Sequence, residues 1–288
     1  MIYVLFLLAV TVVWGWTFVL VKNAITQYPT LPFLELRFLL AVLVMVALVR
    51  RLPTRRELKV GLVVGAVLAG GYLLQTVGLT TTSPGNAGLI TGLFVVFTPI
   101  IDRFFGVTLH RRTWVAAVLA LIGVAMLTGG PSGFGVGDIL MLGAAILLAL
   151  HIVLLSRWSP GLQAAPLAML QMGTCALIFA AGGSWSLQPP TGGVWFAIVV
   201  TGVFASALAF YIQTWAQAHL DASRTALILA TEPAWAVVAS VALAGQRFGL
   251  VQALGAGLVL AAIVGHELVP LTTRSREPAP KNRIQGST

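Results

Sequence analysis

Charged residues are scarce in this chain. Asp, Glu, Lys and Arg make up 9% of its 288 residues, whereas a soluble globular domain carries roughly 25%. Hydrophobic residues account for 58% of the sequence, and its mean hydropathy is +0.97. Because helices satisfy their backbone hydrogen bonds internally, and about 20 apolar residues cross a bilayer, we predict an all-α polytopic membrane protein.

The chain also lacks the residue patterns of several enzyme classes. Its single cysteine, Cys175, allows no intrachain disulfide. There is no G-x-x-x-x-G-K-[ST] loop, so ATP is not expected to drive the protein directly, and no G-x-S-x-G or H-E-x-x-H motif. The four histidines are scattered along the sequence. We therefore expect no enzymatic activity, no cofactor and no metal site.

Apolar stretches long enough to span a membrane occur throughout the sequence. Turn signals such as Tyr28-Pro29, Gly129-Gly130-Pro131 and Pro189-Pro190 separate them. We predict ten transmembrane helices, at residues 2–22, 32–50, 58–78, 84–105, 112–129, 137–156, 163–182, 192–215, 222–245 and 249–270.

The basic residues orient these spans, because cytoplasmic loops carry an excess of Lys and Arg. With a cytoplasmic N-terminus, only Lys22, Arg37 and Arg247 of the 17 lysines and arginines fall outside cytoplasmic segments. We expect a multi-pass protein of the cell (inner) membrane with both termini in the cytoplasm. The pI near 10.8 then reflects topology, and no nucleic-acid partner is expected. Residues 271–288 have little apolar content and are predicted to form a disordered basic cytoplasmic tail.

Two stretches in different halves of the chain resemble each other. Residues 75–90 read QTVGLTTTSPGNAGLI, and residues 213–228 read QTWAQAHLDASRTALI. Each half of the chain then holds five spans, and this odd number gives the second copy the opposite orientation in the membrane. We predict two inverted five-helix repeats, residues 1–130 and 131–270, around a central cavity, as is usual in secondary transporters.

Several short motifs resemble those of the drug/metabolite transporter superfamily, in particular its ten-helix EamA-type branch. They are Trp14-Gly15-x-x-Phe18-x-x-x-Lys22, Arg37-Phe38, the restarts at 86–90 and 224–228, and Thr231-Glu232-Pro233-Ala234-Trp235. The resemblance implies secondary-active export of amino acids, aromatic or otherwise amphipathic, or of related small metabolites, by alternating access. Aromatic-amino-acid exporters are similar proteins.

The fourth span departs from the family pattern. Related proteins often have a proline in the first half where Pro233 aligns, but here Phe94-Val95 stand there and Pro99 comes one turn later. We therefore expect the kink in this span to be displaced.

Glu232 is the most informative residue of the sequence. It lies about ten residues into the ninth span, which is roughly 15 Å at 1.5 Å per residue and so close to the midplane. A carboxyl group within a membrane span is costly and is treated as functional by default. Pro233 breaks the helix beside it. Glu232 could line a substrate cavity and couple transport to protons, or it could brace the kink that Pro233 creates.

The other site candidates are aromatic or polar residues that lie deep in a span or near its end. Trp14 and Phe18 share a helix face with Lys22. They could stack an aromatic or cationic substrate, although such stripes are more often plain packing. Polar side chains in hydrocarbon need partners, which a substrate or a neighbouring helix can supply. The predicted substrate-binding residues are Trp14, Phe18, Tyr72, Gln75, Asn86, His151, Gln171, Tyr211, Gln213, Trp215 and Glu232.

An efflux carrier for lipophilic organic cations or drugs is the alternative function. A cation carrier needs the carboxylate of Glu232 and little else, whereas an amino-acid carrier also needs a donor for the α-carboxylate. Lys22, Arg37 or a helix N-terminus could provide that donor. A channel is a further class that the sequence leaves open.

The expected partners are a small-molecule substrate and the lipid bilayer. Small residues recur at every fourth position of the tenth span, at Ala253, Gly257, Ala261 and Gly265. Such a face lets helices approach closely. It could meet the rest of the chain or a second copy, so a monomer and a homodimer both remain open.

Overall fold

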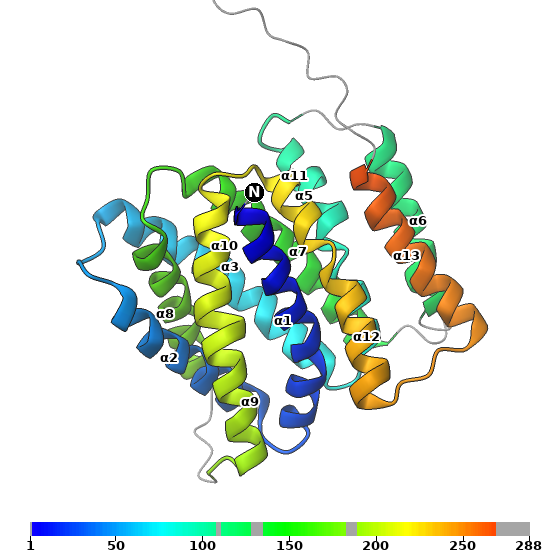
Figure 1. Ribbon diagram of the computed structural model, residues 1–288, viewed down its shortest axis with the longest axis horizontal. Helices are drawn as coiled ribbons and strands as arrows, with labels where there is room; N and C mark the ends of the chain where they lie inside the picture. Colours follow the sequence, from blue (N-terminus) through cyan, green and yellow to red (C-terminus); the bar gives the residue numbers. More distant parts are fainter. Residues whose placement is uncertain (1, 108–110, 128–134, 183–188, 269–288) are drawn as a thin grey trace, which may run out of the picture.

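The structure, a computed structural model, describes residues 2–107, 111–127, 135–182 and 189–268, and within these ranges it contains helices but no strand (Figure 1). The helices of the first half are α1 Ile2–Ile25, α2 Thr30–Leu48, α3 Arg55–Leu79, α4 Pro84–Thr91, α5 Phe94–Arg103 and α6 Arg111–Leu127. Those of the second half are α7 Val136–Trp158, α8 Ala164–Gly182, α9 Gly192–Gly202, the π-helical turn η1 Val203–Leu208, α10 Ala209–Gln217, α11 Ala222–Leu229, α12 Glu232–Ala244 and α13 Leu250–Leu268.

Each of the ten predicted spans corresponds to one helix or to one interrupted helix. The described residues include 7 helices that are long and apolar enough to cross a membrane, and α12 and α13 add shorter apolar stretches. The fourth span is divided into α4 and α5, the eighth contains η1, and the ninth is divided into α11 and α12. The prediction of an all-α polytopic membrane protein is confirmed. The predicted tail and the predicted boundary at residue 130 lie outside the described residues.

The contacts between helices follow a two-fold pattern, as two related halves require. The fifth span packs on the tenth (α6 on α13), and the second packs on the seventh (α2 on α8). In the same way α5 packs on α7, and its counterpart α12 packs on α1. Figure 1 shows α6 and α13 side by side at one edge of the helix bundle. The halves therefore surround a common centre as inverted repeats.

The interruption of the ninth span follows from its proline. Pro233 has no N–H to donate to the carbonyl of residue 229, and its ring would clash with that carbonyl. Accordingly α11 ends at Leu229 and α12 begins at Glu232. Glu232 therefore lies in the first turn of a new helix in the middle of the span, beside unpaired backbone groups.

The fourth span is interrupted at the equivalent position, and our expectation that its kink would be displaced is wrong. The register that aligns Gln75 with Gln213 also aligns the break at Gly92-Leu93 with the break at Ala230-Thr231. Pro99 lies within the continuous helix α5. The partner helix is in close contact with this break. A Cβ atom on Gly92 would overlap with Cγ of Pro233, so the proline ring occupies the space that a side chain at position 92 would need.

Glycines bring the two interrupted spans into direct contact. A Cβ atom on Gly88 of α4 would overlap with the Cβ of Ala236 on α12, and one on Gly15 of α1 would overlap with Trp235. α12 is therefore held between α1 and α4 at distances that only glycine permits. This contact fixes where the first turn of α12, with Glu232, lies.

Small residues have different roles in the third and tenth spans. Cβ atoms on Gly61 and Gly65 of α3 would meet Leu170 and Thr174 of α8, so this face packs closely. In contrast, Gly257 of α13 has open space where its Cβ atom would be, and Ala253 and Ala261 are exposed. These three residues of the tenth-span stripe therefore face away from the rest of the described chain.

These contacts predict the effects of two glycine substitutions. Gly88→Ala forces α4 and α12 apart, and we expect it to lower the stability by about 1–3 kcal/mol. Gly257→Ala is the matched control, because it adds a methyl group to open space in a helix and should be neutral or stabilising by up to about 1 kcal/mol. Thermal denaturation of the purified variants in detergent measures both effects. Equal melting temperatures for the two variants would contradict the close α4–α12 contact.

Candidate substrate-binding site

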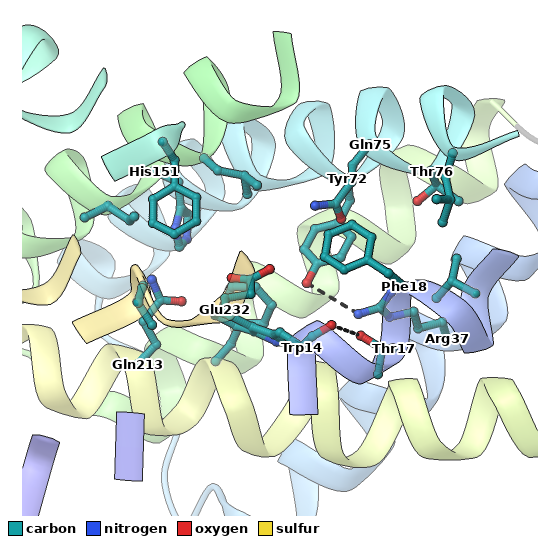
Figure 2. Close-up of a pocket in the computed structure, with 17 residues that line it drawn as sticks. Trp14, Thr17, Phe18, Arg37, Tyr72, Gln75, Thr76, His151, Gln213 and Glu232 are labelled. Atoms are coloured by element: carbon teal, nitrogen blue, oxygen red, sulfur yellow. Dashed lines mark hydrogen bonds between the residues drawn. The ribbon is translucent and has the colours of Figure 1, made fainter. Parts of the chain in front are cut away.

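A cavity lies at the centre of the helix bundle (Figure 2). Both halves of the chain contribute to its wall. Its lining from the first half consists of Trp14, Thr17, Phe18, Val21, Arg37, Tyr72, Gln75, Thr76, Leu79 and Phe94. Its lining from the second half consists of Leu148, His151, Ile152, Phe210, Gln213, Leu229 and Glu232.

Arg37 of α2 brings a cation to this cavity. Its side chain is buried, with 3% of the residue exposed. Nε donates a hydrogen bond to Oγ of Ser206 at 2.8 Å, and one terminal N–H group donates to the hydroxyl of Tyr72 at 3.4 Å. The guanidinium also lies 4.7 Å from the centre of the Tyr72 ring. No carboxylate of the described residues forms an ion pair with Arg37.

The π-helical turn η1 holds two residues of the cavity wall. In this turn the N–H of Ala209 donates to the carbonyl of Phe204, five residues back. The turn presents Ser206 to Arg37, and the carbonyl of Ala205 accepts a hydrogen bond from Nε1 of Trp14 at 2.8 Å. Such bulges within α-helices are frequent at functional sites. Here the turn orients one cation and one aromatic ring.

Glu232 brings an anion to the same cavity. The residue is buried, with 6% exposed, and within the described chain its carboxyl group has neither an ion pair nor a hydrogen bond. The neighbouring Thr231 is tied to α1 through a 2.8 Å hydrogen bond between its hydroxyl and that of Thr11. The carboxyl group is therefore held by its backbone and remains available to a ligand.

Aromatic rings lie between these two charged groups. The rings of Trp14 and Phe210 have centroids 5.3 Å apart, and those of Tyr72 and Phe210 lie 5.9 Å apart. Phe18 also lines the cavity. Figure 2 shows Glu232 and Gln213 toward one end of the cavity and Arg37 toward the other. The cavity therefore presents a cation, an anion and aromatic rings to a ligand.

A network of polar side chains closes one end of the cavity. Nε2 of His151 and Oε1 of Gln171 are 2.8 Å apart, and Nε2 of Gln171 donates to the hydroxyl of Thr214 at 3.1 Å. Nε2 of Gln213 donates to Oε1 of Gln217 at 2.9 Å. Near this end Arg157 of α7 pairs with Asp102 of α5 at 2.7 Å.

Seven of the eleven predicted site residues line the cavity: Trp14, Phe18, Tyr72, Gln75, His151, Gln213 and Glu232. Their contact with a substrate stays a prediction. They share one cavity because polar and aromatic side chains within the spans are turned toward the protein interior.

The four other predicted residues do not line this cavity. Gln171 lies behind His151, and Asn86 accepts a hydrogen bond from Gln246 at 3.3 Å near the start of α4. Trp215 packs against Tyr3, with ring centroids 4.4 Å apart. Tyr211 is half-buried and also lies outside the lining. For the first three, contacts within the protein account for the side chain without a ligand.

Phe210 and Arg37 are absent from the predicted site residues although both line the cavity. Phe210 could have been predicted from the internal repeat, because the register that pairs Gln75 with Gln213 also pairs the site residue Tyr72 with Phe210. Arg37 is predicted above as a possible donor for a substrate carboxylate, but not as a residue buried in the protein interior. Its burial depends on Ser206, 169 residues away in the sequence, and no local pattern reveals such a partner.

Lys22 does not line the cavity and has another role. Its Nζ donates hydrogen bonds to the carbonyls of Leu79 at 2.7 Å, Thr80 at 2.8 Å and Thr82 at 3.3 Å. A lysine in this position satisfies the final carbonyls of a helix. It therefore fastens the end of α1 to the end of α3.

Comparison with known proteins agrees with this architecture. The profile of the EamA-like transporter family matches residues 1–129 and again residues 135–266. The chain belongs to the EamA-like transporter family. It is therefore a membrane transporter. The family and the relatives described next are all named as transporters.

Individual relatives of this EamA-like protein extend over most of its length. An uncharacterized transporter of Archaeoglobus fulgidus is 32% identical over 259 residues, which cover 88% of this chain and 82% of the relative. The uncharacterized inner membrane transporter YedA of Escherichia coli K12 is 26% identical over 270 residues, covering 90% and 88%. A crystal structure with 18% identity has a TM-score of 0.66 and covers 89% of this chain and 93% of its own, which shows a shared fold.

The contacts of Lys22 separate a structural role from substrate binding. We expect Lys22→Met to lower the stability by about 1–3 kcal/mol, because three carbonyls lose a charged donor. Binding of substrate should be retained, and Lys59→Met at an exposed position is the control. Thermal denaturation measures the stability of each variant, and equilibrium binding to the same preparations measures its affinity for substrate. A variant with unchanged stability and lost binding would make Lys22 a substrate ligand instead.

Proposed function

We propose that this EamA-like transporter carries amino acids with aromatic or otherwise amphipathic side chains, or closely related metabolites, through the central cavity by alternating access. The observation that carries the proposal is that Arg37 and Glu232 line one cavity while neither has an ion-pair partner within the described residues. A zwitterion carries a counter-charge for each of these two residues.

The energetics of buried charges favour this assignment. An unpaired charge in a low-dielectric interior is costly, and removal of one member of a buried pair is strongly destabilising. A substrate carboxylate can form a bidentate contact with the guanidinium of Arg37. A substrate ammonium group can pair with the carboxylate of Glu232. Both contacts then stabilise the bound state far more than they would at an exposed surface.

The rings of the cavity wall suit an apolar or aromatic side chain. Trp14 and Phe210 provide aromatic faces between the two charges. Aromatic pairs prefer offset or edge-to-face arrangements and contribute about 0.5–1.5 kcal/mol beyond their buried area. We therefore expect amino acids with large apolar side chains to bind more tightly than small or strongly polar ones.

The alternative, an efflux carrier for lipophilic cations, is disfavoured by Arg37. A cation carrier would use Glu232 and the aromatic rings, but a buried guanidinium on the same cavity repels a cation that has no carboxylate. Among the donors considered for an α-carboxylate, Lys22 is occupied by backbone carbonyls. Of the two basic side chains considered, Arg37 is the one that remains on the cavity.

The two copies of the repeated Gln-Thr pair support alternating access. Gln213 and Thr214 form side-chain hydrogen bonds at the closed end of the cavity. Their counterparts Gln75 and Thr76 line the cavity and form no side-chain hydrogen bond with a described residue. Inverted repeats in different local states are expected of a carrier that exchanges them during transport. We infer that the opposite state closes around Gln75.

We further propose that the protein lies in the cell (inner) membrane with both termini in the cytoplasm. The excess of Lys and Arg in the alternate loops supports this orientation, and the relative YedA is named an inner membrane transporter. In this orientation the cavity end near Val21 and Leu79 faces outward.

We expect net transport to be export, with a proton replacing the substrate ammonium group at Glu232 on the return step.

Charge-deleted analogues test the zwitterion assignment. Arg37→Met should weaken binding of L-tryptophan about 10- to 100-fold, as loss of a hydrogen-bonded charge pair predicts, and should leave tryptamine, which has no carboxylate, unaffected or more tightly bound. Glu232→Gln should weaken L-tryptophan and leave indole-3-propionate unaffected. Arg247→Met, at an exposed position, is the control. Equal losses for L-tryptophan and tryptamine in Arg37→Met would contradict the assignment.

Proton coupling is tested separately in proteoliposomes. We expect uptake of labelled L-tryptophan by the wild type to increase when a pH gradient is imposed. Glu232→Gln should remove this dependence, since the amide cannot exchange a proton at neutral pH. A Glu232→Gln variant that kept both transport and its response to the gradient would remove the coupling role, and Glu232 would then serve only as a ligand or a structural group.

A further inference from the structure

The orientation of the Gln213 side-chain amide is determined by the groups behind it. Nε2 of Gln217 lies 2.9 Å from the carbonyl of Ile152, which can only accept a hydrogen bond. Gln217 must therefore direct its NH₂ group toward α7 and its Oε1 toward Gln213. That oxygen accepts from Nε2 of Gln213 at 2.9 Å. A chain of three groups thus fixes which atom of Gln213 faces away from Gln217.

The outward atom is Oε1 of Gln213, and it has no partner. The residue is 2% exposed and lines the cavity, and Oε1 is one of few buried side-chain atoms of the described chain without a hydrogen bond. A buried acceptor without a donor costs about 1–3 kcal/mol. Gln75, its counterpart in the first repeat, is half-buried and faces the cavity without a comparable tie.

Glu232 presents further acceptors at the same end of the cavity (Figure 2). Nε2 of the nearby His151 is committed to Gln171, and this end also offers the Gln213 oxygen and the Glu232 carboxylate as acceptors. The donors of Arg37 lie toward the other end. A ligand group that satisfies both acceptors needs a positive charge and at least two N–H bonds.

We propose that Oε1 of Gln213 and the carboxylate of Glu232 together form a subsite for a primary ammonium group, and that Gln213 selects such groups over quaternary ones. This inference rests on the proposed function, because it specifies the end of the cavity that receives the substrate nitrogen. A primary ammonium has three N–H donors, enough for both acceptors. A trimethylammonium group has the same charge and no donor, so it leaves Oε1 of Gln213 buried and unpaired.

The test uses four ligands and the purified full-length protein. L-Tryptophan and tryptamine each have a primary ammonium group, and each is compared with its N,N,N-trimethyl derivative by isothermal titration calorimetry. We expect the wild type to bind each primary compound about 10- to 100-fold more tightly than its trimethyl form, the range for a hydrogen bond to a charged group. Equal affinities within both pairs would overturn the proposal.

Two variants separate hydrogen bonding from size. Gln213→Met keeps the length of the side chain and removes the acceptor, so it should reduce the preference for the primary ammonium about tenfold. Gln75→Met, at the counterpart position, should keep the preference. If Gln213→Met preserves the wild-type ratio, the subsite is disproved. If Gln213→Met does not fold, Gln213→Asn withdraws the same acceptor by one methylene group and should reduce the ratio likewise.

The four ligands also distinguish this inference from the proposed function. If the primary ammonium is preferred through Gln213 but L-tryptophan binds no better than tryptamine, the carboxylate contact and the amino-acid function fail while the subsite stands. If L-tryptophan binds better than tryptamine but Gln213→Met leaves the trimethyl ratio unchanged, the function stands and the subsite fails.

Discussion

The contact between two interrupted helices at the centre of the protein determines where its functional groups lie. Pro233 ends α11 at Leu229 and lies against Gly92, where the fourth span is broken at the matching position although it has no proline there. Gly88 and Gly15 then allow α12 to lie close against α4 and α1. This arrangement holds Glu232 at the start of a helix inside the membrane, where lipid offers no alternative partner.

A second constraint supplies the opposite charge. The π-helical turn Val203–Leu208 directs Ser206 toward Arg37 and a carbonyl toward Trp14, so one irregular turn orients a cation and an aromatic ring. With Glu232 and Gln213 toward the other end, the cavity has donors at one side and acceptors at the other. A cation without a carboxylate would pair with the acceptors and leave the donors of Arg37 without a partner from the substrate. Charge distribution, more than shape, therefore argues for a zwitterionic substrate.

Much of this architecture could be predicted from the sequence, because it depends on local signals. Hydropathy predicted the spans, and the repeated Gln-Thr stretch predicted the two halves, in a register that also aligns the break at Gly92 with that at Ala230. The depth of Glu232 followed from helix rise. The unpredicted features depend on contacts between the halves. The break in the fourth span lies against a proline of the other repeat, and the burial of Arg37 involves Ser206 in a turn with no sequence signature.

The central claim is that one cavity binds a zwitterion between Arg37 and the pair Glu232 and Gln213. An experimental structure of the protein with L-tryptophan tests it most directly. The account predicts the ammonium group between Glu232 and Gln213, the carboxylate directed toward the Arg37 guanidinium, and the indole against the aromatic rings of the cavity wall. An L-tryptophan molecule bound in the reverse orientation, or bound outside this cavity, would contradict the account.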